Sequence, residues 1–463
     1  MADHRLRESQ TIHALATPLG RSGIAVLRIS GPGAVSVVRK LAPFLPAEVE
    51  SHRVYYGHLE SLLMEAHRID EVLLTPFLGG RSFTGEECVE ISCHGNPVII
   101  DEIQKELIHA GSLPAEPGEF TYRAFMNGRL DLVQAESVLS VIESQSPFEK
   151  ANALKQLGGA VSQQVASIEK QILHTLAHLE ADIDFSTEGL ETMSSDELIS
   201  SLKQVSREID QLVAGYERGR VLEEGFRVVF AGPPNVGKSS LLNLVLGENR
   251  AIVTEIAGTT RDTIEAWTEV NGVRVCWTDT AGLRETADVV ENLGIDRVRE
   301  QLRRADLVFW VSAPDVMVGE DQKDLEWILR ERPDVLVFLR NKADLGEAAV
   351  ATVSGAEAIP VLQGSVRSAG ADLVERIRES VALRISATGA GESVVISRAR
   401  HFEALTAAKA AMDEALGMAR DRIGRELLAM PLKEALVRVQ SLLGIRYDEQ
   451  VIDQIFKEFC LGK

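Results

Sequence analysis

The first 120 residues alternate short β-branched runs with turns rich in glycine and proline. Residues 23–30 (GIAVLRIS) and 88–92 (CVEIS) have the composition of strands, and the turns between such runs include SGPG and EPGEF. This pattern predicts an α+β domain over residues 1–120.

Long segments with a helical pattern occur on both sides of the middle of the chain. Apolar residues recur at helical spacing, with few glycines or prolines, in residues 124–145 and 167–185, and again in residues 401–416 and 432–443. These segments predict a run of long helices.

Between residues 223 and 383 the pattern changes to short apolar runs that alternate with helical stretches. The strand-like runs are residues 226–232, 273–282, 305–313 and 334–344. This alternation is typical of a doubly wound α/β sheet. A link of small residues, ISATGAGES at residues 385–393, leads back to helical sequence. We therefore expect an α/β domain, residues 223–383, inserted into a helical domain made of residues 121–222 and 384–463.

The composition restricts partners and compartment. The chain has 463 residues, a formal net charge of −20 and four cysteines. Non-specific binding of nucleic acid depends on clustered Lys and Arg, so contact with RNA requires a local patch or a partner. Few cysteines, a start without an apolar signal segment and the absence of a run of about 18 apolar residues indicate a cytoplasmic protein with no membrane span.

A phosphate-binding loop is the strongest chemical signal. Gly232-Pro-Pro-Asn-Val-Gly237-Lys238-Ser239 follows a strand-like run and precedes a helical one. Its glycines let backbone N–H groups turn towards phosphate oxygens. Lys238 adds charge at the outer phosphates, and the Ser239 hydroxyl can bind Mg2+.

Two further motifs follow in the order expected for a GTPase. Asp279-Thr-Ala-Gly282 ends a strand-like run and supplies a carboxylate near Mg2+ and a glycine N–H for the terminal phosphate. In Asn341-Lys-Ala-Asp344, the aspartate can accept hydrogen bonds from the ring N–H and the amine of guanine, which adenine does not offer. The alternative for Asp344 is a helix N-cap.

Two less specific segments complete the expected pocket. Gly258-Thr259-Thr260-Arg-Asp contains a threonine, Thr260, that can bind Mg2+, although a surface turn has the same composition. Ser365-Val366-Arg367 follows the strand-like IPVLQG and can close over the base.

The group that activates water is not evident from the motifs. Leu283 stands where many GTPases carry a glutamine, so the polar group comes from elsewhere, with Glu285 and Glu291 among the candidates downstream. Asn235, inside the phosphate loop, either ligates a monovalent cation beside the phosphates or caps the loop through its own backbone. The residues alone leave both possibilities open.

Motifs along nearly the whole chain resemble those of the MnmE (TrmE) family of tRNA-modifying GTPases, in the TrmE-Era-EngA-YihA-Septin-like superfamily. They are GRSGIAVLRISGP, PGEFTYRAFMNGRLDL, GPPNVGKSS, IAGTTRD, DTAGLRE, NKAD and the terminal FCLGK. Ordinary GTP switches carry neither the PGEF segment nor the terminal Cys-x-Gly-Lys. The resemblance implies a multidomain chain with a folate-binding-like, dimerising N-terminal domain, a helical domain and an inserted Ras-like P-loop GTPase domain.

The resemblance also implies a reaction and its partners. With an FAD-dependent partner, MnmG (GidA), the enzyme would add a carboxymethylaminomethyl or aminomethyl group to C5 of the wobble uridine of certain tRNAs. The one-carbon donor would be a tetrahydrofolate derivative, the 5,10-methylene or 5-formyl form. A homodimer, a heterotetramer with MnmG, and K+-dependent GTP hydrolysis activated by pairing of GTPase domains are expected.

Site residues follow from the same resemblance. K+ is expected at Asn235, Thr254, Ile256 and Thr259, and Mg2+ at Ser239 and Thr260. Glu291 is expected to position the attacking water, with Glu285 as second choice. Folate is expected at Arg28, Glu90, Arg129 and Lys463. Motifs and resemblance together assign GTP contacts to Asn235, Val236, Gly237, Lys238, Ser239, Ser240, Thr254, Glu255, Ile256, Ala257, Gly258, Thr259, Thr260, Asp279, Thr280, Ala281, Gly282, Asn341, Lys342, Ala343, Asp344, Ser365, Val366 and Arg367.

The chain departs from the family pattern at a few positions. Arg129 replaces a lysine of some relatives, Leu461 replaces a more usual Ile or Val, and Val366 occupies a normally small position. None removes a charge or a metal ligand. The competing hypotheses are a regulatory GTPase switch in ribosome assembly and a dimer scaffold without chemistry of its own.

Overall fold

The computed structural model describes residues 9–184, 192–247, 265–280, 291–316, 322–346, 359–368, 370–388 and 395–462, without the side chains of residues 291–297 and 388. The chain forms two compact units. The first contains Met1–Ile142, Lys155–Ile209 and Ala404–Lys463, and the second contains Glu143–Leu154 and Asp210–Glu403. The first unit groups the N-terminal sheet with most of the helices, so the expected domain limits stay predictions.

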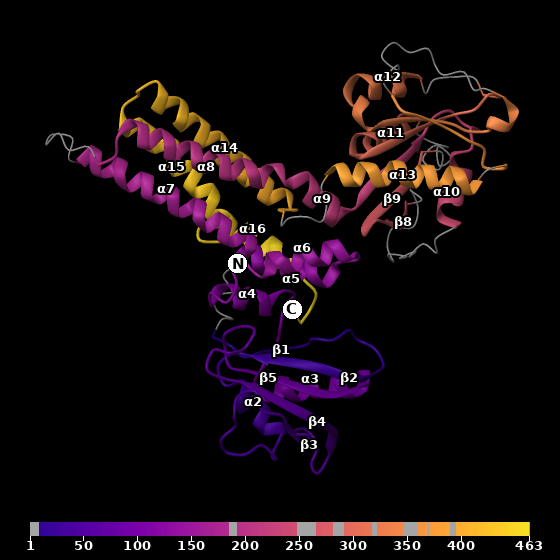
Figure 1. Cartoon of the computed structure of the whole chain (residues 1–463). Helices are drawn as coiled ribbons and strands as arrows, with labels where there is room; N and C mark the ends of the chain where they lie inside the picture. Colours follow the sequence, from indigo (N-terminus) through magenta and orange to yellow (C-terminus); the bar gives the residue numbers. More distant parts are fainter. Residues whose placement is uncertain are drawn as a thin grey trace. The chain divides into compact units, whose positions relative to one another are not determined.

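The N-terminal sheet has six strands in the order β3-β4-β5-β2-β1-β6, antiparallel except for the β1–β6 pair. Helices α2 and α3 contribute to the same apolar core as its strands (Figure 1). Alternation in β2 places Leu27 and Ile29 in this core, whereas Arg28 belongs to the opposite face. The expected α+β fold is confirmed. The elements are β1 (Ile12–Leu15), β2 (Ser22–Ser30), α2 (Ala34–Leu41), β3 (Tyr55–Glu60), β4 (Arg68–Phe77), β5 (Cys88–Gly95), α3 (Pro97–His109) and β6 (Leu113–Pro114).

Long helices make up most of the rest of the first unit. Helix α15 runs along α7, and the two are joined by a hydrogen bond from Gln440 to Glu169 and an ion pair from Lys433 to Glu180. The helices wholly within this unit are α4 (Glu119–Met126), α7 (Ala160–Asp184), α15 (Arg425–Leu443) and α16 (Glu449–Lys457). Helices that continue from one unit into the other are α5 (Leu132–Glu143), α6 (Pro147–Leu157), α8 (Ser195–Ala214) and α14 (Ala399–Arg420), and α9 (Tyr216–Glu224) belongs to the second unit.

The helical pattern expected over residues 124–145 is interrupted. Helix α4 ends at Met126 and α5 begins at Leu132. Gly128 has a φ of 66°, and the N–H of Arg129 bonds to the carbonyl of Ala124 at 2.8 Å. This is the left-handed glycine ending of a helix, which the apolar spacing alone concealed.

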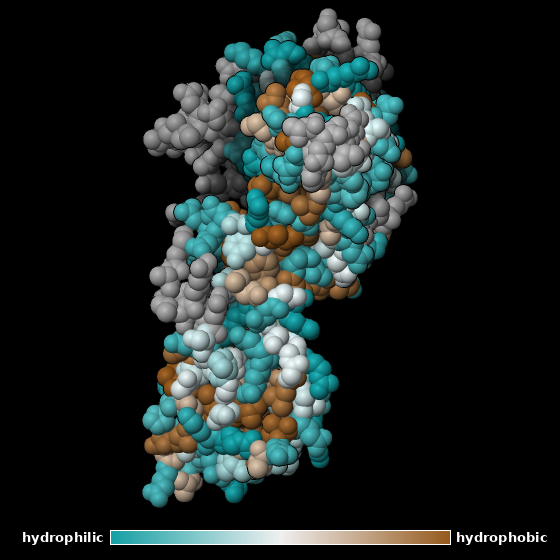
Figure 2. Space-filling view, turned by 90° about the vertical axis from the view of Figure 1, so that its left-hand side faces the viewer, coloured by the Kyte–Doolittle hydropathy of each residue, from teal (hydrophilic) through white to brown (hydrophobic). Residues whose placement is uncertain are grey.

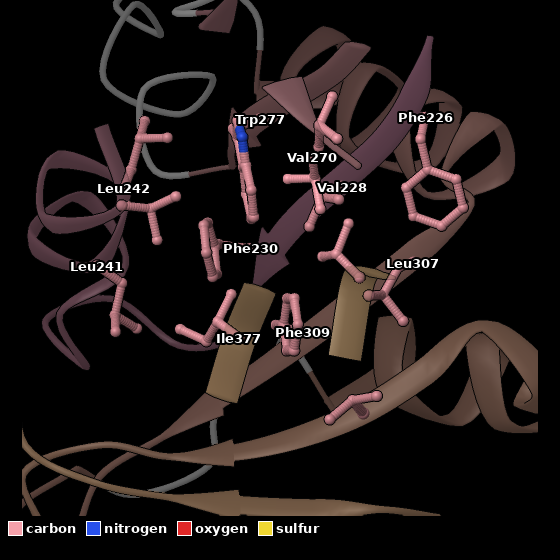
Figure 3. Close-up of a cluster of buried hydrophobic side chains, with 14 of the residues drawn as sticks. Phe226, Val228, Phe230, Leu241, Leu242, Val270, Trp277, Leu307, Phe309 and Ile377 are labelled. Atoms are coloured by element: carbon pink, nitrogen blue, oxygen red, sulfur yellow. The ribbon is translucent and has the colours of Figure 1, made fainter. Parts of the chain in front are cut away.

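The second unit contains a six-stranded sheet in the order β12-β11-β10-β7-β9-β8, parallel except for the edge strand β8. Phe230 of β7 lies between Trp277 and Phe309 of the neighbouring strands (Figure 3). These rings belong to a core shared with α10 and α13, and the other side of β7 packs in a core with α11 and α12. Helices on both faces confirm the doubly wound α/β fold.

The elements of this sheet domain are β7 (Phe226–Ala231), α10 (Lys238–Gly247), β8 (Glu265–Val270), β9 (Val273–Asp279), α11 (Glu291–Arg304), β10 (Leu307–Ser312), α12 (Gln322–Glu331), η2 (Pro333–Val335), β11 (Leu336–Arg340), η3 (Ala343–Leu345), β12 (Val361–Gln363) and α13 (Gly370–Thr388). Helix α13 ends at Thr388, so it includes residues 385–388 of the link expected at residues 385–393. Within the part of the chain that the structure describes, no helix is long and apolar enough to cross a membrane.

Candidate nucleotide site

A pocket of about 580 Å³ lies where the parallel strands β7, β10 and β11 end. The carboxyl ends of parallel strands share one edge of a sheet, so motifs far apart in the sequence meet there. The phosphate loop, the Asn341–Asp344 motif and the Ser365–Arg367 segment all line it. Its lining consists of Pro234, Asn235, Gly237, Lys238, Ser239, Ser240, Asp315, Asn341, Lys342, Asp344, Leu345, Ser365, Val366 and Arg367.

The phosphate loop requires glycine at both ends. Gly232 and Gly237 have φ values of 133° and 97°, which side chains rarely adopt. A Cβ on Gly237 would lie 2.4 Å from Nδ2 of Asn341. The ammonium of Lys238, only 5 % exposed, donates to the carbonyls of Gly232 at 2.9 Å and Pro233 at 2.8 Å. The loop therefore surrounds a fixed cation at the floor of the pocket.

Two oxygen ligands suited to Mg2+ are adjacent. Oγ of Ser239 donates to a carboxylate oxygen of Asp279 at 2.5 Å, which brings the first residues of α10 to the end of β9. Hydroxyl and carboxylate oxygens are the ligands Mg2+ prefers. Thr280, beside them, bonds to the carbonyl of Phe230 rather than lining the pocket.

Asn341 joins the phosphate loop to the loop after β12. Its Nδ2 donates to the carbonyl of Val236 at 2.9 Å, and its Oδ1 accepts from the N–H of Val366 at 3.4 Å. The Asn341 side chain is 2 % exposed, so these bonds are sheltered from water. The sequence motif assigned Asn341 to the pocket but did not reveal this linking role.

Two aspartates, Asp315 and Asp344, line the pocket beside the basic residues Lys342 and Arg367. Asp344 is exposed, and a hydrogen bond from Ser365 lowers its pKa, which keeps the carboxylate ionised as an acceptor. Asp315, at the end of the β10 segment, forms an ion pair with Lys342 at 2.8 Å, and this hydrogen bond lowers the pKa of Asp315. Sequence reasoning missed Asp315, although its position just after a buried strand at the binding edge was a usable signal.

Asn235 adopts a left-handed backbone conformation, with φ 64°, and its carbonyl accepts from the ammonium of Lys342 at 2.9 Å. Asn235 lines the pocket, and its assignment to K+ and GTP stays a prediction. Glu291 begins α11, but its side chain is not described. Several further predicted residues lie outside the described residues: Thr254, Glu255, Ile256, Ala257, Gly258, Thr259, Thr260, Ala281, Gly282, Glu285 and Lys463.

Family models match nearly the whole chain. The model of the MnmE helical domain matches residues 132–460, and the model of the N-terminus of the GTP-binding protein TrmE matches residues 11–129. This chain belongs to the MnmE family. The family resemblance derived from the motifs is thereby confirmed, and the chain is a GTP hydrolase of the tRNA-modification type.

Relatives named tRNA modification GTPase MnmE match this MnmE-family chain over its full length. The protein of Bdellovibrio bacteriovorus is 44 % identical over 99 % of this chain and 98 % of its own length. The protein of Heliobacterium modesticaldum is 39 % identical over 98 % of this chain and 99 % of its own length. The solved G domain of the T. maritima FeoB iron transporter aligns with 35 % of this chain and 98 % of its own length, at 23 % identity and a TM-score of 0.26.

The MnmE-type residues expected to bind folate are partly brought together. Arg28 and Glu90 are register partners on β2 and β5, and their side chains form an ion pair at 2.9 Å. The Arg28 guanidinium lies 5.4 Å from the ring centre of Phe83 and 5.8 Å from that of Phe120. Arg129 is exposed, and its side chain lies against Gly85.

The C-terminal segment reaches the same sheet. Gly462 lies so close to β1 that a Cβ on it would be 2.2 Å from the carbonyl oxygen of Leu15. Leu15 is the register partner of Leu27, the residue before Arg28. Gly462 therefore packs against β1, the strand next to β2, which carries Arg28.

Proposed function

We propose that this GTPase modifies C5 of the wobble uridine of certain tRNAs in the cytoplasm, adding a carboxymethylaminomethyl or aminomethyl group with MnmG (GidA), an FAD-dependent partner. The relatives named tRNA modification GTPase support the reaction class. The observation that carries the finer proposal is the Arg28–Glu90 pair beside the C-terminal segment. A tetrahydrofolate derivative, 5,10-methylene- or 5-formyl-tetrahydrofolate, is the one-carbon donor.

Charge and shape support folate at the Arg28–Glu90 pair. The Glu90 carboxylate can accept from the N–H donors of a pterin ring, and Arg28, Arg129 and Lys463 provide cations for glutamate carboxylates. The aromatic rings of Phe83 and Phe120 lie beside the Arg28 guanidinium. When the folate is bound, it supplies the one-carbon unit, and these side chains hold it.

Potassium and magnesium complete the proposed GTPase site. Ser239 and Thr260 hold Mg2+, and Asn235, Thr254, Ile256 and Thr259 surround K+, whose charge stabilises the transition state. Glu291 positions the attacking water. The wall position of Asn235 and the Ser239–Asp279 contact support the parts of this proposal that fall on described residues.

Exposed apolar side chains support a homodimer that forms through the N-terminal sheet. This homodimer is proposed to form a heterotetramer with MnmG. Figure 2 shows brown patches over its lower part, where this sheet lies. Large apolar residues with more than a third of their surface exposed include Leu19, Ile24, Val54, Tyr56, Leu62, Leu63, Met64 and Leu73. Exposed apolar patches of this kind are typical of protein interfaces.

The cation proposal is tested by measuring GTP hydrolysis in K+ and in Na+. The wild type is expected to be at least about tenfold faster in K+, and Asn235→Ala is expected to lose that advantage because a ligand is removed. Asn243→Ala, an exposed asparagine on α10, is the matched control. Equal rates in the two salts would refute the role of Asn235.

The folate and tRNA proposals have separate tests. Arg28→Ala is expected to weaken binding of 5-formyl-tetrahydrofolate at least about tenfold, while the exposed Arg68→Ala leaves it unchanged. Mass analysis of wobble nucleosides from cells lacking the gene is expected to show loss of the C5 modification. An unchanged nucleoside profile would overturn the proposed reaction.

A further inference from the structure

Two histidines on α7 face each other one helical turn apart. Nε2 of His174 and Nε2 of His178 are 3.3 Å apart, and their ring centres are 4.5 Å apart. His174 is exposed and His178 is half-buried, so solvent ions have access to the pair. The pair lies in the helical part of the first unit, which contains none of the residues of the nucleotide pocket.

Thr192 provides a hydrogen-bond partner for the Nδ1 atom of His178. The hydroxyl of Thr192 donates to the carbonyl oxygen of His178 at 3.2 Å. With the hydroxyl proton donated to that carbonyl, the Thr192 oxygen is an acceptor for Nδ1–H of His178, 3.0 Å away, in the tautomer that carries its proton on Nδ1. In that tautomer Nε2 of His178 presents a lone pair towards His174, with whose Nε2 it is within hydrogen-bond distance, and a bound cation would replace the shared proton.

Thr192 is itself held in place. Its backbone N–H donates to Asp182, whose carboxylate also forms an ion pair with Arg425 of α15. Metal-binding histidines commonly donate their second ring N–H to an oxygen acceptor, which orients the imidazole and raises its basicity. The Thr192 hydroxyl has that position here.

The spacing of the two nitrogens suits one tetrahedral ion. Zinc–nitrogen bonds of about 2.0–2.1 Å at a tetrahedral angle place two ligand nitrogens roughly 3.3–3.4 Å apart. A square-planar ion would need a shorter separation of about 2.9 Å. We propose that His174 and His178 form a zinc-binding site on the surface of α7, supported by Thr192.

Two protein ligands leave two coordination positions. Among the described residues, His174 and His178 are the ligands of the proposed site, since no group of three or more His, Cys, Asp or Glu side chains there is arranged around a metal position. Glu197 lies close enough for His178 to lower its pKa, after the larger effect of hydrogen bonds from Ser194. This carboxylate adds negative potential beside the bound cation.

The test is titration of the full chain with zinc, with GDP and Mg2+ in excess so that the nucleotide site is occupied. Calorimetry is expected to show one site, and cobalt in place of zinc is expected to give the intense visible absorption of a tetrahedral ion. His174→Ala and His178→Ala should each weaken zinc binding at least about tenfold, since a single imidazole remains. His109→Ala, an exposed histidine on α3, should bind zinc like the wild type.

A further variant separates metal binding from a merely structural contact. Thr192→Val keeps the shape of the side chain but removes the acceptor for Nδ1–H, and is expected to weaken zinc binding about 10-fold. Basal GTP hydrolysis checks that each variant is folded. Wild-type affinity in both histidine variants, or no zinc binding by the wild type, would overturn the proposal.

Discussion

Replacing Asn341 by alanine removes a side chain that links the two halves of the nucleotide pocket. Its amide bonds to the carbonyl of Val236 in the phosphate loop and to the N–H of Val366 in the loop after β12. Asn341→Ala removes the hydrogen-bond partner of the Val236 carbonyl and of the Val366 N–H, at a position that is sheltered from water. The loops then lose their common anchor even though neither loop is mutated.

The magnitude follows from the cost of an unsatisfied buried polar group. Removing one partner of a buried hydrogen bond costs about 1–3 kcal/mol. The 2.9 Å bond to Val236 carries most of this, because the 3.4 Å bond to Val366 is long. A loss of about 2 kcal/mol in the nucleotide-bound form corresponds to roughly 30-fold weaker binding.

Titration with a fluorescent GDP analogue measures this loss directly. Asn341→Ala is expected to raise the Kd about 30-fold, and Asn243→Ala serves as the exposed control. Asn341→Asp keeps the size but replaces the donor with an oxygen facing the carbonyl of Val236, so its effect should be at least as large. A Kd within twofold of the wild type for Asn341→Ala would refute the linking role.

Two further predictions concern a buried histidine and the base-reading carboxylate. Burial lowers the pKa of His13 to about 4, so between pH 6.5 and about 4 the unfolded chain takes up a proton that the folded chain does not. The free energy of unfolding should therefore fall by up to about 3 kcal/mol as the pH drops through that range, and it should fall less in His13→Asn. Urea unfolding of both proteins at several pH values measures this. Midpoints that fall equally with pH in the wild type and in the variant would contradict the prediction. Asp344→Asn should weaken GTP binding at least about 100-fold and favour xanthine nucleotides, which carry an acceptor in place of the guanine amine. Competition between GTP and xanthosine triphosphate measures the preference. If Asp344→Asn binds GTP as tightly as the wild type does, Asp344 does not recognise the guanine base.

Much of the sheet domain was readable from local sequence. The apolar runs correspond to β7, β9, β10 and β11, because buried parallel strands need apolar side chains on both faces. The phosphate loop was predicted as a unit because consecutive residues make it. The break between α4 and α5 was missed, since a glycine ending depends on one residue within an otherwise helical pattern.

The sequence by itself thus determined the features that depend on neighbouring residues: strand and helix patterns, the phosphate loop and the family to which they belong. Only the tertiary structure decided which distant groups bond directly to one another. The Asn341–Val236 bond, the Lys342–Asp315 pair and the Arg28–Glu90 pair join residues at least 27 positions apart. Such contacts depend on strand order, register and shared sheet edges, which periodicity along the chain does not specify.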